Sequence, residues 1–283
     1  MKKIAFYKYH GLGNDFLIID HINRSVRSLD YNVLAQRICD RHTGIGADGI
    51  LVLTGSRRAE ACIDLFNSDG SWAEKSGNGL RCVAAYYYGH YERRRRLVFE
   101  INEEPVETRI IKARQASFSI EVGLGRPIFE AKSIPMKTPA KYHINKAIKI
   151  DGFEFVVTSL SVGNPHTVMF VDNFEFDWEA LGEIIENCRY FPNRTNVEFV
   201  RVINRRKVEL NDWERGAGAT GSSGTGAAAS VVAGAINGLV DRRAEVVFPA
   251  GSLFIEWSGQ NDEILLTGPV EFVGRGEYNF ESG

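Results

Sequence analysis

The feature that most constrains the fold of this chain is a short glycine-containing motif that occurs twice. Ser76-Gly77-Asn78-Gly79 opens a stretch of helical character that extends through Tyr88, and Ser223-Gly224-Thr225-Gly226 opens another that extends through Val240. About 150 residues separate the two serines, which is roughly the length of one domain. Because a chain of 283 residues also has the length of about two domains, the repeat predicts one structural unit present in two copies.

Each copy of the motif predicts a site that favours anions. A small polar side chain and unpaired backbone N–H groups meet at a helix N-terminus, where the helix dipole also attracts negative charge. Two such sites facing each other would hold a small carboxylate from both sides. A purely structural alternative stays open, because Ser-Gly is a common helix N-cap and the glycine-rich segment 215–226 is also typical of a flexible loop.

The charge balance excludes several classes of partner. The chain has 34 Lys and Arg residues against 36 Asp and Glu residues, and this net charge of −2 provides no field to attract nucleic acid or an acidic membrane. The longest apolar run, 227–240, is interrupted by Ser230 and Asn237 and is shorter than the roughly 20 residues that a membrane span needs. We therefore expect a cytoplasmic protein that binds neither nucleic acid nor membranes.

The cysteines indicate neither a disulfide nor a metal site. They form no CxxC pair and lie in otherwise apolar segments, at Cys39, Cys62, Cys82 and Cys188. This distribution is typical of reduced, half-buried thiols in a cytoplasmic protein. We therefore expect no metal.

Short apolar runs predict strands in both halves of the chain, with only a few helices. Strands are expected at 4–7, 16–19, 49–54, 61–66, 97–101, 106–113, 117–122, 153–162, 167–171, 197–202, 207–210, 253–257 and 263–267. Asp30 and Asp177 are each expected to cap one further helix. The pattern restarts after residue 123, which predicts one domain of residues 1–123 with 269–283 and a second of residues 124–268. Mixed strands with few helices predict an α+β architecture instead of a doubly wound parallel sheet.

Several polar turns share a composition that exceeds what turns alone require. They contain Asn14, 67–71, 163–166, Asn196 and 214–215. Asn and Arg in turns are usually turn formers or solvated charges. Five such clusters beside two anion-binding helix starts indicate a recognition site.

These segments resemble the diaminopimelate epimerase family, whose cofactor-independent members invert one α-carbon of diaminopimelate on the way to lysine and peptidoglycan. The resemblance runs nearly end to end, through HGLGNDF at 10–16, GIGADG at 44–49, NSDGSWAE at 67–74, SGNGLRC at 76–82, GNPH at 163–166, FPNRTNVEF at 191–199, ERGAGAT at 214–220 and SGTGA at 223–227. It implies two similar, pseudo-symmetric domains, each a mixed β-sheet or barrel around a central helix. It also implies an active site in the cleft between the domains, a small amino acid substrate, no cofactor and a homodimer.

The resemblance assigns the catalytic positions but not their usual residues. Family members carry a cysteine where this chain has Ser76 and Ser223, and the two thiols remove and deliver the α-proton on opposite faces. His166 and Glu214 match residues that assist those thiols. A serine hydroxyl does not ionise appreciably at neutral pH unless another base takes its proton. We therefore expect impaired turnover.

The recognition positions are retained better than the catalytic ones. By resemblance, the substrate-binding residues are Asn14, Asn67, Gly77, Asn78, Asn164, Asn196, Glu214, Arg215, Gly224 and Thr225. An arginine with a glutamate suits the carboxylate and ammonium of an amino acid. Two further departures from the family are Ala219, where a glutamate is common, and Ala228, where a cysteine is frequent.

Three functional interpretations follow from this pattern. The first is a diaminopimelate epimerase whose thiols have been replaced, which would bind its ligand with little turnover. The second is an isomerase of this or another amino acid that uses the hydroxyls with help from His166 and Glu214. The third is a non-catalytic amino acid-binding protein on the same fold.

Overall fold

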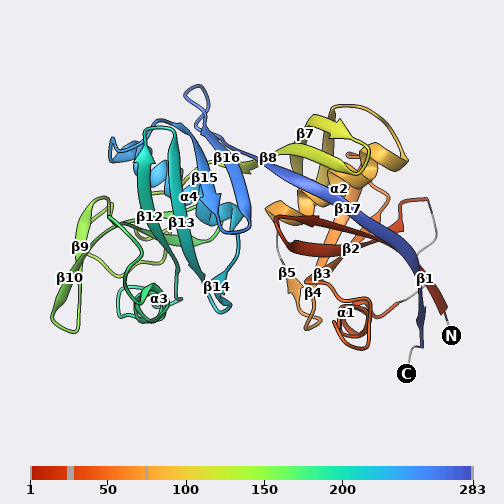
Figure 1. Cartoon of the computed structure of the whole chain (residues 1–283), viewed down its shortest axis with the longest axis horizontal. Coiled ribbons are helices and arrows are strands. Elements are labelled where there is room, and N and C mark those ends of the chain that lie inside the picture. The colour runs from red at the N-terminus through yellow and green to blue at the C-terminus, as the bar shows by residue number, and fades with distance from the viewer. Residues whose placement is uncertain (1, 24–28, 74–75, 282–283) are drawn as a thin grey trace. The chain divides into compact units, whose positions relative to one another are not determined.

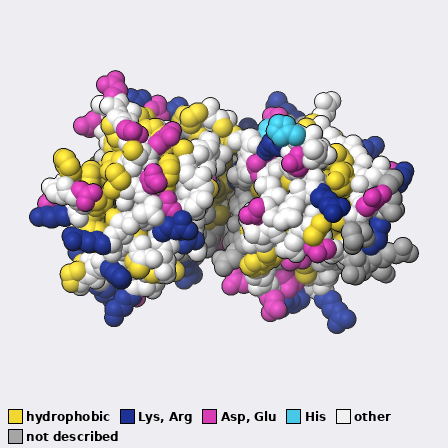
Figure 2. All heavy atoms as spheres, turned by 90° about the horizontal axis from the view of Figure 1, so that it is seen from below, with side chains coloured by type: hydrophobic (Ala, Val, Ile, Leu, Met, Phe, Trp, Pro, Cys, Tyr) yellow, Lys and Arg dark blue, Asp and Glu magenta, His cyan; other side chains and the backbone are white. Residues whose placement is uncertain are grey.

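The computed structural model describes residues 2–23, 29–73 and 76–281. These residues form two compact units, Met1–Val122 with Gly268–Gly283, and Gly123–Thr267. Over the described ranges, each unit contains β-strands and two helices. Figure 1 labels the helices α1 to α4 in chain order. Within the described residues, no helix is long and apolar enough to cross a membrane. Acidic and basic side chains are interspersed on the face drawn in Figure 2, as the near balance of charge predicts.

The first unit is built around one buried helix. Its elements are β1 (Lys2–Gly11), β2 (Asn14–His21), α1 (Tyr31–Ile38), β3 (Gly49–Thr54), β4 (Ala61–Asn67), β5 (Trp72–Ala73), α2 (Gly77–His90), β6 (Arg96–Ile101), β7 (Glu104–Arg114), most of β8 (Ser117–Gly125) and the end of β17 (Ile264–Phe280). Every residue of α2 from Asn78 to Tyr87 is buried, and the helix packs against β1, β2 and β7. A helix that is buried on all sides forms the core of its unit.

The second unit has the same plan. Its elements are β9 (Lys146–Ile150), β10 (Phe153–Ser161), β11 (Pro165–Phe170), α3 (Trp178–Glu186), β12 (Asn196–Asn204), β13 (Lys207–Glu214), β14 (Gly218–Thr220), α4 (Gly224–Ile236), β15 (Arg243–Phe248), β16 (Gly251–Trp257) and the start of β17. Every residue of α4 from Gly226 to Gly234 is buried. Because these residues are Gly, Ala, Ser and Val, strands can pack closely against all sides of the helix.

The strand pairings repeat in the same order in both units. In the first unit β2 and β3 are parallel, β3 and β4 antiparallel, β4 and β6 parallel, and β6 and β7 antiparallel. In the second unit β11 and β12, β12 and β13, β13 and β15, and β15 and β16 follow the same sequence of directions. The expected α+β architecture of two similar units is therefore confirmed.

The helix in the second unit ends earlier than its apolar pattern predicts. It was expected to extend through Val240, but α4 stops at Ile236 with Asn237 as its C-cap. Gly238 has a φ of +72°, and the N–H of Leu239 returns to the carbonyl of Gly234 at 2.9 Å. This left-handed glycine ends the helix in the manner of a Schellman motif.

Candidate functional site

Ser76 caps the central helix of the first unit. Its backbone is extended (φ −135°, ψ 120°), and its hydroxyl oxygen accepts a hydrogen bond from the N–H of Gly79 at 3.1 Å. Ser76 and Gly77 are only half-buried. The first turn of a helix leaves backbone N–H groups without acceptors inside the helix. The helix start with a serine cap, which the motif predicted, is therefore present at the start of α2.

Asn78 and Asn14 lie together at this helix start. The amide of Asn78 donates to Asn14 Oδ1 at 3.0 Å, and the amide of Asn14 donates to Asp48 Oδ2 at 2.7 Å. Asp48 Oδ2 also accepts from the N–H of Asp15 at 3.0 Å. Asn14 is thus held between the helix start and a carboxylate, which fixes the orientation of its amide group.

Asn67 lies at the same edge of the sheet but does not join this group. It is the last residue of β4, opposite Gly49 at the start of β3. Its side chain is exposed and donates to the hydroxyl of Ser71 at 3.0 Å, within its own turn. The backbone of that turn is linked to the group through Asp48, whose carbonyl accepts from the N–H of Ser68 at 3.0 Å.

Ser223 caps the central helix of the second unit in the same way. Its backbone is extended (φ −109°, ψ 122°), and its hydroxyl oxygen accepts from the N–H of Gly226 at 3.1 Å. Gly224 and Thr225 form the first turn of α4 and are half-buried, whereas Ser223 is buried. Both predicted helix starts therefore have the same local geometry.

His166 forms a fully buried pair with a glutamate that the sequence interpretation missed. His166 on β11 and Glu198 on the parallel strand β12 approach to 2.6 Å between Nδ1 and Oε1. The other ring nitrogen, Nε2, lies 2.8 Å from Asn164 Oδ1. Burial raises the pKa of Glu198, an effect that His166 opposes. A glutamate in the apolar strand sequence Asn-Val-Glu-Phe-Val was the signal that could have identified this residue.

Asn196 connects two of the predicted recognition loops. Its amide donates to the carbonyl of Pro165 at 2.7 Å, and its Oδ1 accepts from the N–H of Arg215 at 2.9 Å. Arg215 is exposed, and its guanidinium makes one long contact of 3.4 Å to the carbonyl of Asn193. The structure therefore brings these loops together and leaves the Arg215 side chain available for a ligand.

Glu214 lies beside a second carboxyl group that the sequence interpretation missed. Its Oε1 accepts from the hydroxyl of Thr220 at 2.6 Å, and Asp212 on the same strand also contacts that hydroxyl. Burial raises the pKa of Asp212 to about 7. An aspartate two residues before Glu214 lies on the same face of the strand, which is the pattern that could have revealed it.

The four cysteines are buried or half-buried thiols. Cys39 and Cys82 are fully buried, whereas half-buried thiols were expected, and Cys62 and Cys188 are half-buried as expected. Burial raises the pKa of Cys82 to about 12, and burial also raises the pKa of Cys62. Among the described residues, no group of His, Cys, Asp or Glu side chains could hold a metal ion.

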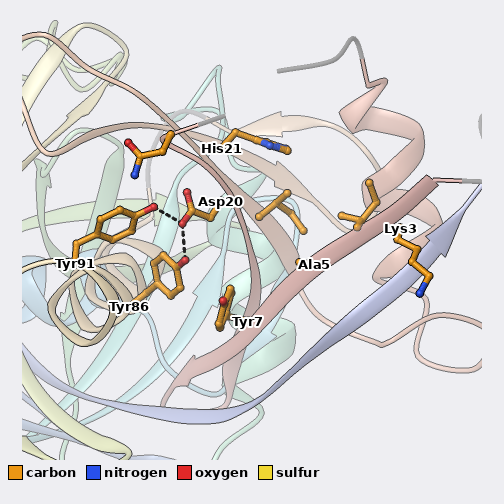
Figure 3. A pocket seen from close by; sticks show the side chains of 10 residues that line it. Lys3, Ala5, Tyr7, Asp20, His21, Tyr86 and Tyr91 are labelled. Carbon is orange, nitrogen blue, oxygen red and sulfur yellow. Dashed lines mark hydrogen bonds between the residues drawn. The ribbon is translucent and has the colours of Figure 1, made fainter. Parts of the chain in front are cut away.

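A pocket of about 240 Å³ in the first unit lies apart from the predicted residues. It is lined by Lys3, Ile4, Ala5, Tyr7, Ile19, Asp20, His21, Asn23, Tyr86 and Tyr91. Figure 3 shows the hydroxyls of Tyr86 and Tyr91 donating to Asp20, at 2.6 and 2.5 Å. Tyr86 lies ten residues after Ser76, or about 15 Å along the helix axis at 1.5 Å per residue. This pocket is therefore near the opposite end of α2 from the candidate site.

The comparisons of sequence agree on one family, and a comparison of structure shows a similar fold. The sequence model for the family described as Diaminopimelate epimerase matches residues 6–130 and 158–273. A diaminopimelate epimerase of Carboxydothermus hydrogenoformans is 42% identical over 278 residues, which cover 97% of this chain and 99% of that protein. Another from Pelotomaculum thermopropionicum is 39% identical over 280 residues, which cover 98% and 99%. The fold is also similar to a crystal structure of a Bacillus anthracis phenazine biosynthesis protein of the PhzF family, with a TM-score of 0.67, 13% identity and coverage of 99% and 100%.

Proposed function

Because this chain belongs to the diaminopimelate epimerase family, we propose that it binds diaminopimelate with Ser76 and Ser223 at the two proton-transfer positions. The observation that carries the proposal is the matched pair of helix starts. Each serine caps the buried central helix of its unit, with the same extended backbone and the same hydrogen bond to the third residue after it. Unpaired N–H groups at such helix starts are suited to a carboxylate.

The remaining predicted residues have complementary recognition roles in this proposal. Asn14 and Asn67 contribute from the first unit, and Asn164, Asn196, Glu214 and Arg215 contribute from the second. Glu214 would face the ammonium group and Arg215 the carboxylate of the distal, non-reacting end of the ligand. The backbone N–H groups of Gly77, Asn78, Gly224 and Thr225 would hold the carboxylate at the reacting carbon.

Turnover is proposed to be impaired because, among the described residues, the hydroxyls of Ser76 and Ser223 are hydrogen-bonded only to helix N–H groups and not to a base. Proton abstraction next to a carboxylate requires a strong base, and a serine supplies one only when a neighbour takes its proton. Within the described residues, no hydrogen bond links the hydroxyl of Ser223 to His166 or Glu214. His166 is engaged by Glu198 and Asn164, and Glu214 is engaged by Thr220. Because His166 and Glu214 are already engaged by other side chains, these contacts favour a protein that binds its ligand without efficient epimerisation. They do not favour a protein in which the serine hydroxyls carry out catalysis.

Deuterium exchange and calorimetry together test this proposal. The pure protein is mixed with LL-diaminopimelate in heavy water, and the loss of the α-proton signal is followed by NMR while binding is measured by titration calorimetry. We expect heat of binding with little or no α-deuterium incorporation. Absence of binding would overturn the proposed function, and rapid exchange would show that the hydroxyls do act as bases. A parallel titration with proline shows whether the protein binds a cyclic amino acid more tightly than diaminopimelate.

The family also supports a homodimer for this chain, which we include in the proposal. Size-exclusion chromatography with light scattering gives the molar mass of the assembly directly. A mass of twice the chain mass is expected. A monomer at micromolar concentration would exclude a stable dimer.

A further inference from the structure

Arg81 is a buried cation that has no carboxylate partner in the part of the chain that the structure describes. It lies in α2, five residues after Ser76, and its side chain is fully buried. Its Nη2 donates to Asn78 Oδ1 at 2.6 Å, whereas Nε and Nη1 have no hydrogen-bond partner among the described residues. Burial lowers the pKa of Arg81 to about 10, which leaves it protonated at neutral pH. Burying a charge without an opposite charge is costly, so this arrangement requires an explanation.

The guanidinium starts a hydrogen-bond chain whose direction is fixed by its two ends. Arg81 donates to Asn78, Asn78 donates to Asn14, and Asn14 donates to the carboxylate of Asp48. An arginine can only donate and a carboxylate can only accept, so both asparagine amides have a single possible orientation. Asp48 also accepts from Arg41 at 2.7 Å. Its charge is therefore already paired with a second cation and does not neutralise Arg81.

The local packing holds the guanidinium at this position. A Cβ atom added to Gly11 would lie 2.9 Å from Arg81 Nη2, so a side chain at Gly11 would displace the guanidinium. Five residues at 1.5 Å each separate Arg81 from Ser76 by roughly 7–8 Å along the helix axis. The guanidinium itself lies beside the first turn, because its Nη2 bonds Asn78 Oδ1, and a buried unit charge there acts strongly on an anion at the helix start. It adds to the dipole of α2, which favours negative charge at the same end.

The second unit lacks this cation at the equivalent position. Five residues after Ser223 the chain has Ala228, which is buried in α4. The buried titratable side chains near the start of α4 include Glu198, whose Oε1 would lie 3.3 Å from a Cβ atom at Gly226. The two helix starts are thus alike in backbone geometry but differ in the buried charge behind them.

We propose that Arg81 is a positioning residue of the α2 helix start, which orients Asn78 and whose buried charge strengthens the binding of a carboxylate there. The identity of this ligand as the reacting carboxylate of an amino acid rests on the proposed function. The electrostatic effect of Arg81 on any anion at position 76 is independent of the proposed function. Arg81 itself does not touch the ligand and acts through Asn78 and through its field.

A thiol placed at the helix start measures this field without any substrate. The Ser76→Cys variant is combined with Arg81→Met or Arg81→Lys, and the thiol pKa is measured from the pH dependence of iodoacetamide alkylation. The four native cysteines are accounted for by subtracting the parent chain, and circular dichroism confirms folding. We expect Arg81→Met to raise the thiol pKa by about one unit. At a fixed pH below the pKa, this shift lowers the fraction of thiolate about tenfold. Arg81→Lys retains the charge and should restore most of the shift.

The equivalent reporter in the second unit is the matched control. A thiol from Ser223→Cys should keep its pKa when Arg81 is replaced by Met. An unchanged pKa at position 76, or equal shifts at both reporters, would overturn the proposal. If Arg81→Met does not fold, Arg81→Gln provides a second route, because an uncharged side chain that can still donate to Asn78 removes the buried charge and should also raise the thiol pKa at position 76. Failure of diaminopimelate to bind would overturn the proposed function and leave this result standing.

Discussion

Asp212 and Glu214 share one hydroxyl group. Thr220 Oγ1 lies 2.5 Å from Asp212 Oδ2 and 2.6 Å from Glu214 Oε1. A threonine hydroxyl carries one hydrogen, so it can donate to one carboxyl group and can only accept a hydrogen bond from the other, which must then carry a proton. Because burial raises the pKa of Asp212 to about 7, Asp212 is the group that holds the proton. At pH values below about 7 the second unit therefore contains a protonated carboxyl beside a residue of the candidate site.

The first prediction concerns the pH dependence of stability. Between about pH 4 and pH 7 the folded chain keeps a proton on Asp212 that the unfolded chain releases, so the free energy of unfolding falls as the pH rises through this window. Asp212→Asn removes the titration and retains a donor toward Thr220. Between pH 4 and pH 8, the free energy of unfolding should therefore decrease less in Asp212→Asn than in the parent chain. The expected difference is on the order of 2–4 kcal/mol.

Urea unfolding followed by tryptophan fluorescence measures this difference. Of the four tryptophans in the chain, three lie in the second unit, at Trp178, Trp213 and Trp257, so the signal mainly reports the unit that contains Asp212. Asp172→Asn, at an exposed position, serves as the control and should follow the parent profile. Parallel pH profiles for the parent and Asp212→Asn would contradict a protonated Asp212.

The second prediction concerns the missing thiols. Ser76→Cys together with Ser223→Cys should create or raise α-proton exchange on diaminopimelate, because thiols at two helix starts ionise far more readily than hydroxyls. Either substitution alone should do much less. Proton exchange in heavy water, followed by NMR, gives the rate for all three variants. A double variant that binds ligand without exchanging the proton would show that these are not the proton-transfer positions.

The third prediction concerns Arg215. Arg215→Ala should weaken diaminopimelate binding by about 2 kcal/mol or more, since it would leave a desolvated carboxylate without its bidentate partner. Arg94→Ala removes the same charge from an exposed residue that pairs with Glu60, and it should leave the affinity unchanged. Titration calorimetry compares the two. Equal losses of affinity would place the ligand elsewhere.

The fourth prediction separates the capping role of the serines from any role in binding. Ser76→Ala and Ser223→Ala each remove a hydrogen bond to a helix N–H and should lower the free energy of unfolding by about 1 kcal/mol. Ser117→Ala, at the exposed start of β8, should change it by much less. Urea midpoints measure all three. Unchanged midpoints in the two cap variants would mean that the hydroxyls do not stabilise the helices.

Local sequence patterns predicted most of the elements, because strands and helices depend on short-range periodicity and end signals. β3 was expected at 49–54 and occupies Gly49–Thr54. Asp30 and Asp177 were expected to cap helices, and both side chains accept from a backbone N–H in the first turn. The repeated Ser-Gly motif predicted both central helices and the two-unit plan, since a cap acts within one turn of the chain.

The same local reasoning failed where a distant contact decided the outcome. Strands β9 and β15 were not expected, because charged residues interrupt their apolar positions and only pairing with β10, β13 and β16 makes them strands. The end of α4 was placed four residues late, because Ile236 to Val240 remains mostly apolar while Gly238 turns the backbone. Helix and strand propensities of the local sequence predict secondary structure poorly where contacts with distant residues decide it.

The sequence by itself determined the two-unit α+β plan, the two serine caps and the polar loops of the candidate site, since each is encoded in a few consecutive residues. Only the tertiary structure decided which charges are buried. Nothing in the local sequence marks Arg81 as buried, and the strand patterns around Glu198 and Asp212 give only a weak signal, yet all three side chains are enclosed in the structure. The environment of each is built by elements that are distant along the chain, and burial in a low dielectric is what shifts the pKa of each side chain and strengthens the effect of a buried charge on its neighbours.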